Sequence, residues 1–84
     1  MENQLETTPK RVIEAAKAVE TELARRISIA QLPQNLEDAA MYAVVHGGKR
    51  VRPTLTLLCC EAVGGTWEHA MSAAVAVEYI HCFS

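Results

Sequence analysis

At 84 residues, the chain has room for one small domain and excludes an arrangement of several independent cores. Its formal net charge of −2 excludes the broad basic surface that general nucleic-acid binding requires. Half of the residues are hydrophobic, which predicts that part of the apolar surface packs against the rest of a chain or a partner subunit.

The chain has three cysteines, and they fit neither a zinc site nor a disulfide framework. Cys59, Cys60 and Cys82 are odd in number and contain no C-x-x-C pair. We interpret them as reduced, buried thiols of a cytoplasmic protein. No signal peptide is recognisable at the N-terminus, and the longest apolar run, 73–77, is too short to span a membrane.

The first predicted helix begins with Thr8 as N-cap and Pro9 as its first helical residue. Apolar residues then recur at steps of four and three positions, which is typical of an amphipathic helix. These residues are Val12, Ala16, Val19, Leu23 and Ile27. Residues 28–34 interrupt the pattern and contain Pro33, so we interpret them as a linker.

A second helix is predicted to begin with Asn35 as its cap and to end at His46. The end is set by Gly47 and Gly48, because helix C-termini commonly need a residue with left-handed geometry. The apolar stripe of this helix consists of Leu36, Ala39, Ala40, Ala43 and Val44.

A third helix is predicted from Pro53 to about Val63, where Gly64 and Gly65 terminate it. Thr66 would then cap a fourth helix. No stretch of the sequence favours a strand. The prediction is therefore an all-α chain of about four helices.

The fourth helix is apolar on nearly all sides from residue 70 to 84, which predicts a helix enclosed on most sides. Its few polar residues include Glu78, His81 and Ser84, spaced so that they lie roughly along one face. A polar seam on a buried helix usually lines a site. A lone histidine in such a helix is, however, more often a hydrogen-bonded core residue than a ligand.

Residues 47–53 read Gly-Gly-Lys-Arg-Val-Arg-Pro and place three cations between a helix end and a helix start. Arg52 offers a planar fork for phosphate oxygens and Lys49 a mobile point charge. The N-terminus of the next helix adds a dipole that favours an anion. We expect Arg52 to be extended because it precedes proline. This loop predicts an anion site, although a solvated turn explains its composition equally well. It is not a Walker A loop.

Two segments together resemble a known family. The loop at 47–53 resembles the G-G-K-x-x-R-P signature of trans-isoprenyl (polyprenyl) diphosphate synthases, which include farnesyl and geranylgeranyl diphosphate synthases. The helix at 73–84 resembles the E-x-I-H-x-x-S segment of the same family, at the right separation. The resemblance covers residues 35 to 84. It implies the N-terminal helices of the isoprenoid synthase bundle.

The resemblance implies roles for four residues. Lys49, Arg52 and His81 would hold the diphosphate of isopentenyl diphosphate, and Gly48 would let the backbone approach it. For Arg50 the role stays open between a contribution to the field and a place on the surface. The reaction implied is a condensation of isopentenyl diphosphate with an allylic diphosphate. Most family members are homodimers.

The resemblance also implies Mg²⁺, which the family binds through two aspartate-rich motifs. Neither motif occurs in the sequence, whose only aspartate, Asp38, is better explained by a helix dipole. We interpret residues 1–84 as the N-terminal part of a synthase domain, truncated before the first aspartate motif. The chain alone is expected to be inactive, with no metal ligands of its own.

The floor of the product tunnel lies, in this family, just before the first aspartate motif. If the family spacing continues beyond Ser84, Phe83 and Ser84 would be chain-length residues, and the Phe83 ring would favour a short product. Two alternatives remain. The chain could be a non-catalytic helical subunit that binds a complete synthase, or a small helical interaction or DNA-binding domain.

Overall fold

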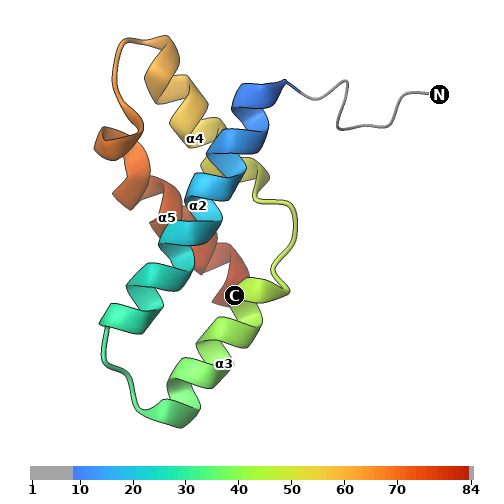
Figure 1. The fold of residues 1–84 in the computed structure, drawn as a ribbon, viewed down its shortest axis with the longest axis vertical. Helices are drawn as coiled ribbons and strands as arrows, with labels where there is room; N and C mark the ends of the chain where they lie inside the picture. The colour runs from blue at the N-terminus through green and yellow to red at the C-terminus, as the bar shows by residue number, and fades with distance from the viewer. Residues whose placement is uncertain (1–8, 84) are drawn as a thin grey trace, which may run out of the picture.

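The fold is all-α in the computed structural model, which describes residues 9–83. The helices are α2 (Lys10–Ile29), α3 (Gln34–Val45), α4 (Val51–Ala62) and α5 (Trp67–Phe83) (Figure 1). No strand occurs within the described range, and the predicted all-α class with four helices is confirmed.

The helices form two thin layers. α2 lies across α4 and α5, and α3 returns from the far end of α2 as the second arm of a hairpin (Figure 1). The shortest dimension of the molecule is 20 Å, about two helix diameters. A single core lies between the layers; its buried apolar residues are Ala15, Val19, Leu23, Ile27, Val44, Leu57, Ala74 and Val75.

The buried stripe of α2 differs by one position from the predicted stripe. Ala15, rather than Ala16, is fully buried, and Val12 is only half-buried. The core residues therefore keep a strict four-residue spacing down to Ile27. Pro9 is the N-cap and not the first helical residue, and its carbonyl accepts the first helical hydrogen bonds. The predicted cap Thr8 lies outside the described residues.

The linker after α2 is shorter than predicted. α3 begins at Gln34 with Pro33 as its N-cap, so Asn35 is inside the helix and not its cap. The carbonyl of Pro33 accepts the Glu37 amide at 2.9 Å, which starts the helix without a capping side chain. The helix ends as predicted, with His46 as its C-cap.

α4 begins two residues earlier than predicted, at Val51, with Arg50 as its N-cap. Pro53 is the third helical residue, where a missing amide hydrogen breaks no intrahelical bond. The Thr54 amide then donates to the Arg50 carbonyl at 3.1 Å. Arg52 is consequently helical, and the expected extended conformation was wrong: the proline lies within the first turn.

α5 is covered on one side only in the described chain. Ala74, Val75 and Glu78 are buried, whereas Ile80 is 70% exposed and Phe83 is 53% exposed. The predicted enclosure on most sides was wrong for these residues, because only α2, α3 and α4 pack against the helix. No described helix is both long and apolar enough to cross a bilayer.

The three cysteines are free thiols, but they are not all buried as predicted. Cys59 is exposed on α4, and Cys60 and Cys82 are half-buried. Cys60 donates to the Thr66 carbonyl at 3.4 Å across the turn between α4 and α5.

Candidate functional site

The centre of the 47–53 loop is a buried arginine. Arg50 adopts a left-handed backbone conformation with φ of 61°, and its side chain turns inward so that the residue is only 4% exposed. Its Nη1 donates to Glu78 Oε2 of α5 at 2.7 Å. Its Nη2 donates to the Val44 carbonyl at the end of α3. Glu20 of α2 lies 3.5 Å from its Nε.

These contacts decide a question that the sequence left open. Arg50 is not at the surface: it joins the start of α4 to the other three helices. Its partner Glu78 is 2% exposed. The two form a buried ion pair, hereafter the Arg50–Glu78 pair.

The two glycines before this pair have different roles. A Cβ on Gly47 would lie 2.5 Å from Arg50 Nη1 and 2.7 Å from Cys82 Sγ, so only glycine lets the loop and α5 approach this closely. Gly48 has open space around it but a φ of +108°, which other residues rarely adopt. Close approach inside the protein therefore occurs at Gly47; a role of Gly48 toward a ligand stays a prediction.

Arg52 and His81 line the same pocket. They come from the first turn of α4 and the last turn of α5, and Val77 and Ile80 complete the wall. The pocket is open to solvent and has a volume of about 240 Å³. We call it the Arg52–His81 pocket. It combines a cationic fork and an imidazole with two apolar side chains, as an amphiphilic anion would require.

Lys49 is not part of this pocket. It lines a separate cavity of about 180 Å³ between α2 and α4, together with Arg50 and Thr54 and with apolar side chains. The structure thus brings together two of the three expected diphosphate ligands and places the third on an adjoining face.

The members of the expected polar seam on α5 differ in burial. Glu78 faces the interior and pairs with Arg50, whereas His81 is exposed at the Arg52–His81 pocket. Ser84, the third member of the seam, lies outside the described residues. The sequence singled out Arg50 and Glu78 separately, but no spacing rule signals a contact between residues so far apart.

Cys82 contacts both residues of the Arg50–Glu78 pair. Its thiol donates to Glu78 Oε2 at 3.7 Å. Burial raises the pKa of the Cys82 thiol, and the Glu78 carboxylate raises this pKa further. The thiol therefore stays protonated near neutral pH, where it is a hydrogen-bond donor to Glu78 and not a nucleophile.

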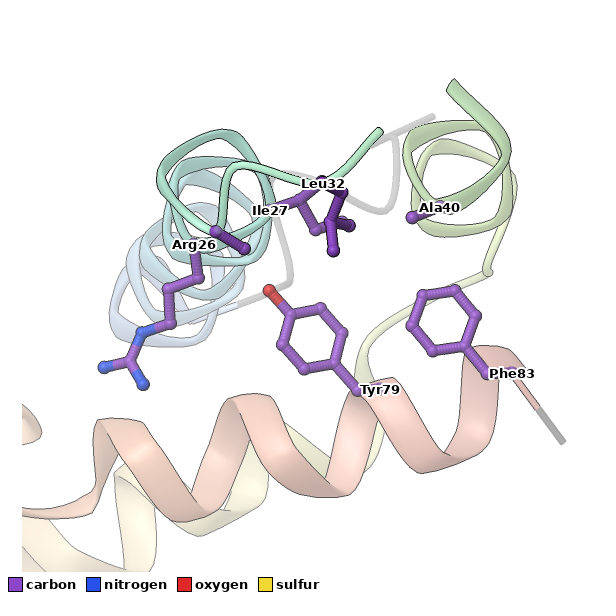
Figure 2. Close-up of a pocket in the computed structure, with 7 residues that line it drawn as sticks. Arg26, Ile27, Leu32, Ala40, Tyr79 and Phe83 are labelled. Atoms are coloured by element: carbon purple, nitrogen blue, oxygen red, sulfur yellow. The ribbon is translucent and has the colours of Figure 1, made fainter. Parts of the chain in front are cut away.

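Phe83 lies beside an apolar pocket of about 240 Å³ between α5 and the ends of α2 and α3 (Figure 2). Its ring stacks on Tyr79, with centroids 5.8 Å apart. The Tyr79 hydroxyl donates to the Leu23 carbonyl of α2 at 2.7 Å, and burial raises the pKa of this phenol. A second apolar cavity of about 360 Å³ adjoins Phe83 from the side of α3. Phe83 thus borders apolar space, and its role in chain length stays a prediction.

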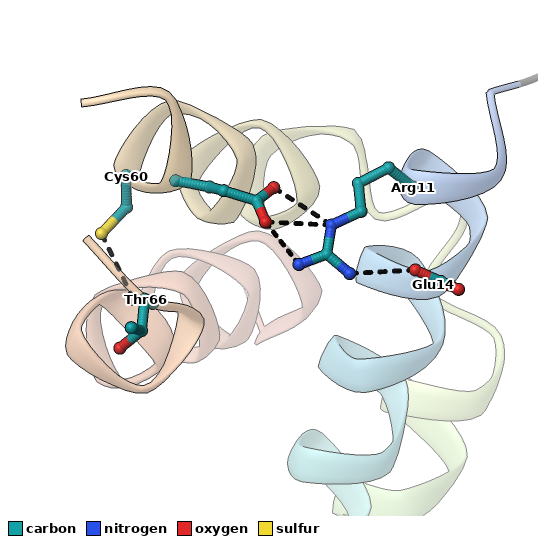
Figure 3. Close-up of polar contacts among 5 residues, drawn as sticks. Arg11, Glu14, Cys60 and Thr66 are labelled. Carbon is teal, nitrogen blue, oxygen red and sulfur yellow. Dashed lines mark hydrogen bonds and ion pairs between the residues drawn. The ribbon is translucent and has the colours of Figure 1, made fainter. Parts of the chain in front are cut away.

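A second arginine cluster lies at the other end of α4. Arg11 of α2 donates to Glu61 through two nitrogens and to Glu14 at 2.9 Å (Figure 3). Its guanidinium also lies 4.0 Å above the Trp67 ring. These four residues, hereafter the Arg11 cluster, join α2, α4 and α5 at the surface. Sequence reasoning missed this arginine.

Magnesium was expected to bind outside this chain. Within residues 9–83, no group of three or more histidine, cysteine, aspartate or glutamate side chains could hold a metal ion. The described residues therefore do not fit the metal that the resemblance implies, and the roles assigned below to this chain involve no metal.

Known proteins resemble the chain in the region of the site. The family model of polyprenyl synthetase matches residues 33–84. A chloroplastic geranylgeranyl pyrophosphate synthase of Capsicum annuum is 47% identical over 73 residues, which are 87% of this chain and 20% of that protein. Geranylgeranyl pyrophosphate synthase 4 of Arabidopsis thaliana is 54% identical over 52 residues, 62% of this chain and 14% of that protein.

A mitochondrial relative, geranylgeranyl pyrophosphate synthase 10 of Arabidopsis thaliana, is 38% identical over 73 residues, 87% of this chain and 21% of that protein. The matched residues span between 14% and 21% of the length of these relatives. No solved structure gave a significant match. Because the family model covers more than half of the chain, including the loop at 47–53 and α5, the chain belongs to the polyprenyl synthetase family.

Proposed function

We propose that the protein to which this chain belongs is a prenyltransferase of isoprenoid biosynthesis. It would condense isopentenyl diphosphate with an allylic diphosphate to give a short-chain product of the farnesyl or geranylgeranyl type. The chain would form the N-terminal part of the synthase domain and supply the anchor for isopentenyl diphosphate. Family membership supports the reaction class, and the names of the relatives support the product class.

The observation that carries the proposal is the meeting of Arg52 and His81 in one pocket. The guanidinium fork would hold two diphosphate oxygens at once, and the imidazole would hold a third. Val77 and Ile80 offer apolar contact for the hydrocarbon part of the substrate. The flexible side chain of Lys49 would reach the same diphosphate from its adjoining face, and the N-terminus of α4 would favour its charge.

Titration of the chain with isopentenyl diphosphate, and separately with duplex DNA, tests this assignment. Arg52→Gln removes a charge-assisted hydrogen bond, worth about 1.5–3 kcal/mol. We therefore expect roughly ten- to hundredfold weaker binding of isopentenyl diphosphate. His81→Ala should act in the same direction. Arg25→Gln, which changes an exposed arginine of α2, is the matched control. Equal affinity of the Arg52 variant and the wild type would contradict the proposal, as would preferred binding of DNA.

Product length gives a second test, in the complete protein. Phe83 borders apolar space, and its ring would limit the growing chain. Phe83→Ala should lengthen the main product, as measured by chromatography of the hydrolysed prenyl alcohols. Unchanged product length would remove Phe83 from this role, and Ser84→Phe would then test its neighbour.

Three further features of the complete protein are part of this proposal. Mg²⁺ would be held by residues outside the described range. The protein would be a homodimer, which light scattering of the complete protein would test. A cytoplasmic location stays a prediction, and the chloroplastic and mitochondrial names of relatives make an organelle the competing outcome of imaging a tagged protein.

A second candidate is a non-catalytic subunit that binds a complete synthase. The exposed apolar residues of α5, Ile80 and Phe83, favour a covering element from another part of a synthase. Co-purification with an active synthase and a change in its product would support this candidate. It requires no binding of isopentenyl diphosphate to this chain, so the titration above separates the two.

A further inference from the structure

The Arg50–Glu78 pair comes from the same two segments as the Arg52–His81 pocket, the start of α4 and the end of α5. Arg50 precedes Arg52 by two positions, and Glu78 precedes His81 by one helical turn. Residues one helical turn apart are neighbours on the helix surface, so His81 lies beside Glu78 on α5, but it is exposed where Glu78 is buried. Arg50 turns inward from its left-handed N-cap position, whereas Arg52, in the first turn of α4, is exposed at the pocket. The same two backbone segments therefore carry both the buried pair and the pocket.

The pair fixes the separation of these segments. Both side chains are almost fully removed from water, at 3% and 2% exposure, and a buried charge without its partner is strongly unfavourable. Any movement of α5 away from the start of α4 would stretch the 2.7 Å contact between Arg50 Nη1 and Glu78 Oε2. The pocket would open by the same movement.

The arginine fork also fixes the rotation of the loop. Its second nitrogen donates to the Val44 carbonyl, so Arg50 cannot turn without losing a bond to α3. Gly47 lies against the guanidinium, and the space there admits no Cβ. A lysine at position 50 would keep the charge, but it lacks the planar group that donates to Glu78 and to the Val44 carbonyl at the same time.

We propose that Arg50 and Glu78 are positioning residues, which hold Arg52 and His81 at the spacing of one diphosphate without contacting it. This inference rests on the proposed function, since it assigns that site its supporting structure. It assigns the middle cation of the Gly-Gly-Lys-Arg-Val-Arg-Pro loop to the interior of the protein, and only the outer two cations to the ligand.

The test is the double variant Arg50→Met/Glu78→Met in the full chain. Apolar side chains of similar volume often replace a buried ion pair without loss of stability. Circular dichroism and urea denaturation check the fold, and calorimetry measures the affinity for isopentenyl diphosphate. We expect binding at least tenfold weaker. A weakening of less than threefold would overturn the inference.

A spectroscopic readout separates positioning from stability. In the wild type saturated with isopentenyl diphosphate, both the Arg52 Nε–H signal and the His81 ring signals should shift from their ligand-free positions. In the saturated double variant one of the two should stay near its ligand-free position, because the two groups no longer hold one diphosphate together. Wild-type shifts of both signals in a folded, saturated double variant would overturn the inference.

Further variants distinguish a failure of the proposed function from a failure of the positioning inference. Arg11→Met/Glu61→Met removes the corresponding interhelical pair at the other end of α4 and should change the affinity less than threefold. If Arg52→Gln leaves binding unchanged, the proposed function itself fails. If Arg52→Gln weakens binding and the double variant at 50 and 78 does not, only the positioning inference fails.

If the double variant does not fold, the affinity of Glu78→Gln for isopentenyl diphosphate tests the inference instead. This change keeps the shape of the side chain and an acceptor for Arg50, and removes only the negative charge. We expect more than threefold weaker binding, and wild-type affinity would overturn the inference.

Discussion

Two arginine–glutamate pairs join helices at opposite ends of α4, and their surroundings differ. In the Arg50–Glu78 pair the side chains are 3% and 2% exposed, whereas Arg11 and Glu61 are 51% and 36% exposed. The groups are the same, and both pairs connect segments distant in sequence. Burial makes the first pair a rigid support between helices. The second pair is exposed, so water and dissolved ions compete with its ionic contact.

The largest effect is expected from breaking the buried pair on one side. Arg50→Ala leaves the Glu78 carboxylate without a charged partner in the interior, which costs about 3–5 kcal/mol of unfolding free energy. Urea denaturation followed by circular dichroism measures the loss. A decrease below about 1 kcal/mol would show that water reaches Glu78, and the contrast between the two pairs would disappear.

Gly47 and Gly65 lie beside the two ends of α4, so substitutions there test through packing whether the end with the buried pair is more rigid than the end with the exposed pair. Gly47→Ala places a methyl group against Arg50 Nη1 and should cost about 1–3 kcal/mol, because that buried side chain has no alternative position. Gly65→Ala meets the Cys60 thiol, which is half-buried and can rotate if it gives up its hydrogen bond to the Thr66 carbonyl, and lies 3.3 Å from the Cys60 carbonyl oxygen. We therefore expect a smaller loss in urea denaturation at Gly65. Equal losses would contradict a more rigid N-terminal end of α4.

A smaller effect is expected from Arg11→Ala. The variant loses an exposed ion pair and the contact with the Trp67 ring. Its stability deficit should shrink at 1 M NaCl, because the Debye length is then only about 3 Å. Urea denaturation at low and high salt measures this change. A deficit independent of salt would mean that packing on Trp67, not charge, dominates.

The smallest effect is expected in the pH dependence of the exposed pair. The hydrogen bond from Arg11 lowers the pKa of Glu61 below its ordinary value of 4.5. A lowered pKa in the folded state stabilises the fold above the ordinary value, and this contribution is lost as the pH falls through the folded-state pKa. Glu61→Gln should therefore flatten the decline in stability below about pH 4.5. An unchanged acid profile would contradict the pairing.

The positions of the helices were largely readable from the sequence. Glycines at 47–48 and 64–65 end helices by their backbone freedom, and apolar spacing located the α2 stripe to within one residue. The errors lie at helix starts. Pro33 and Arg50 act as N-caps through their carbonyl groups, and a capping carbonyl has no signature in the side chains.

The site was predictable in part. Arg52 and His81 were singled out from a loop and a helix, and the structure places them at one pocket. Lys49 was expected beside them and lines a neighbouring cavity. The direction of each side chain depends on where α4 begins, and a shift of two residues turns a side chain by about half a circle.

The sequence by itself determined the helical class, the C-terminal ends of the helices and the family, because backbone preferences and short motifs act over a few neighbouring residues. Only the tertiary structure decided that Arg50 turns inward to Glu78 while Arg52 faces solvent. That choice depends on which charge finds a partner when the helices pack, and desolvation makes the pairing of groups far apart in the chain a property of the whole fold.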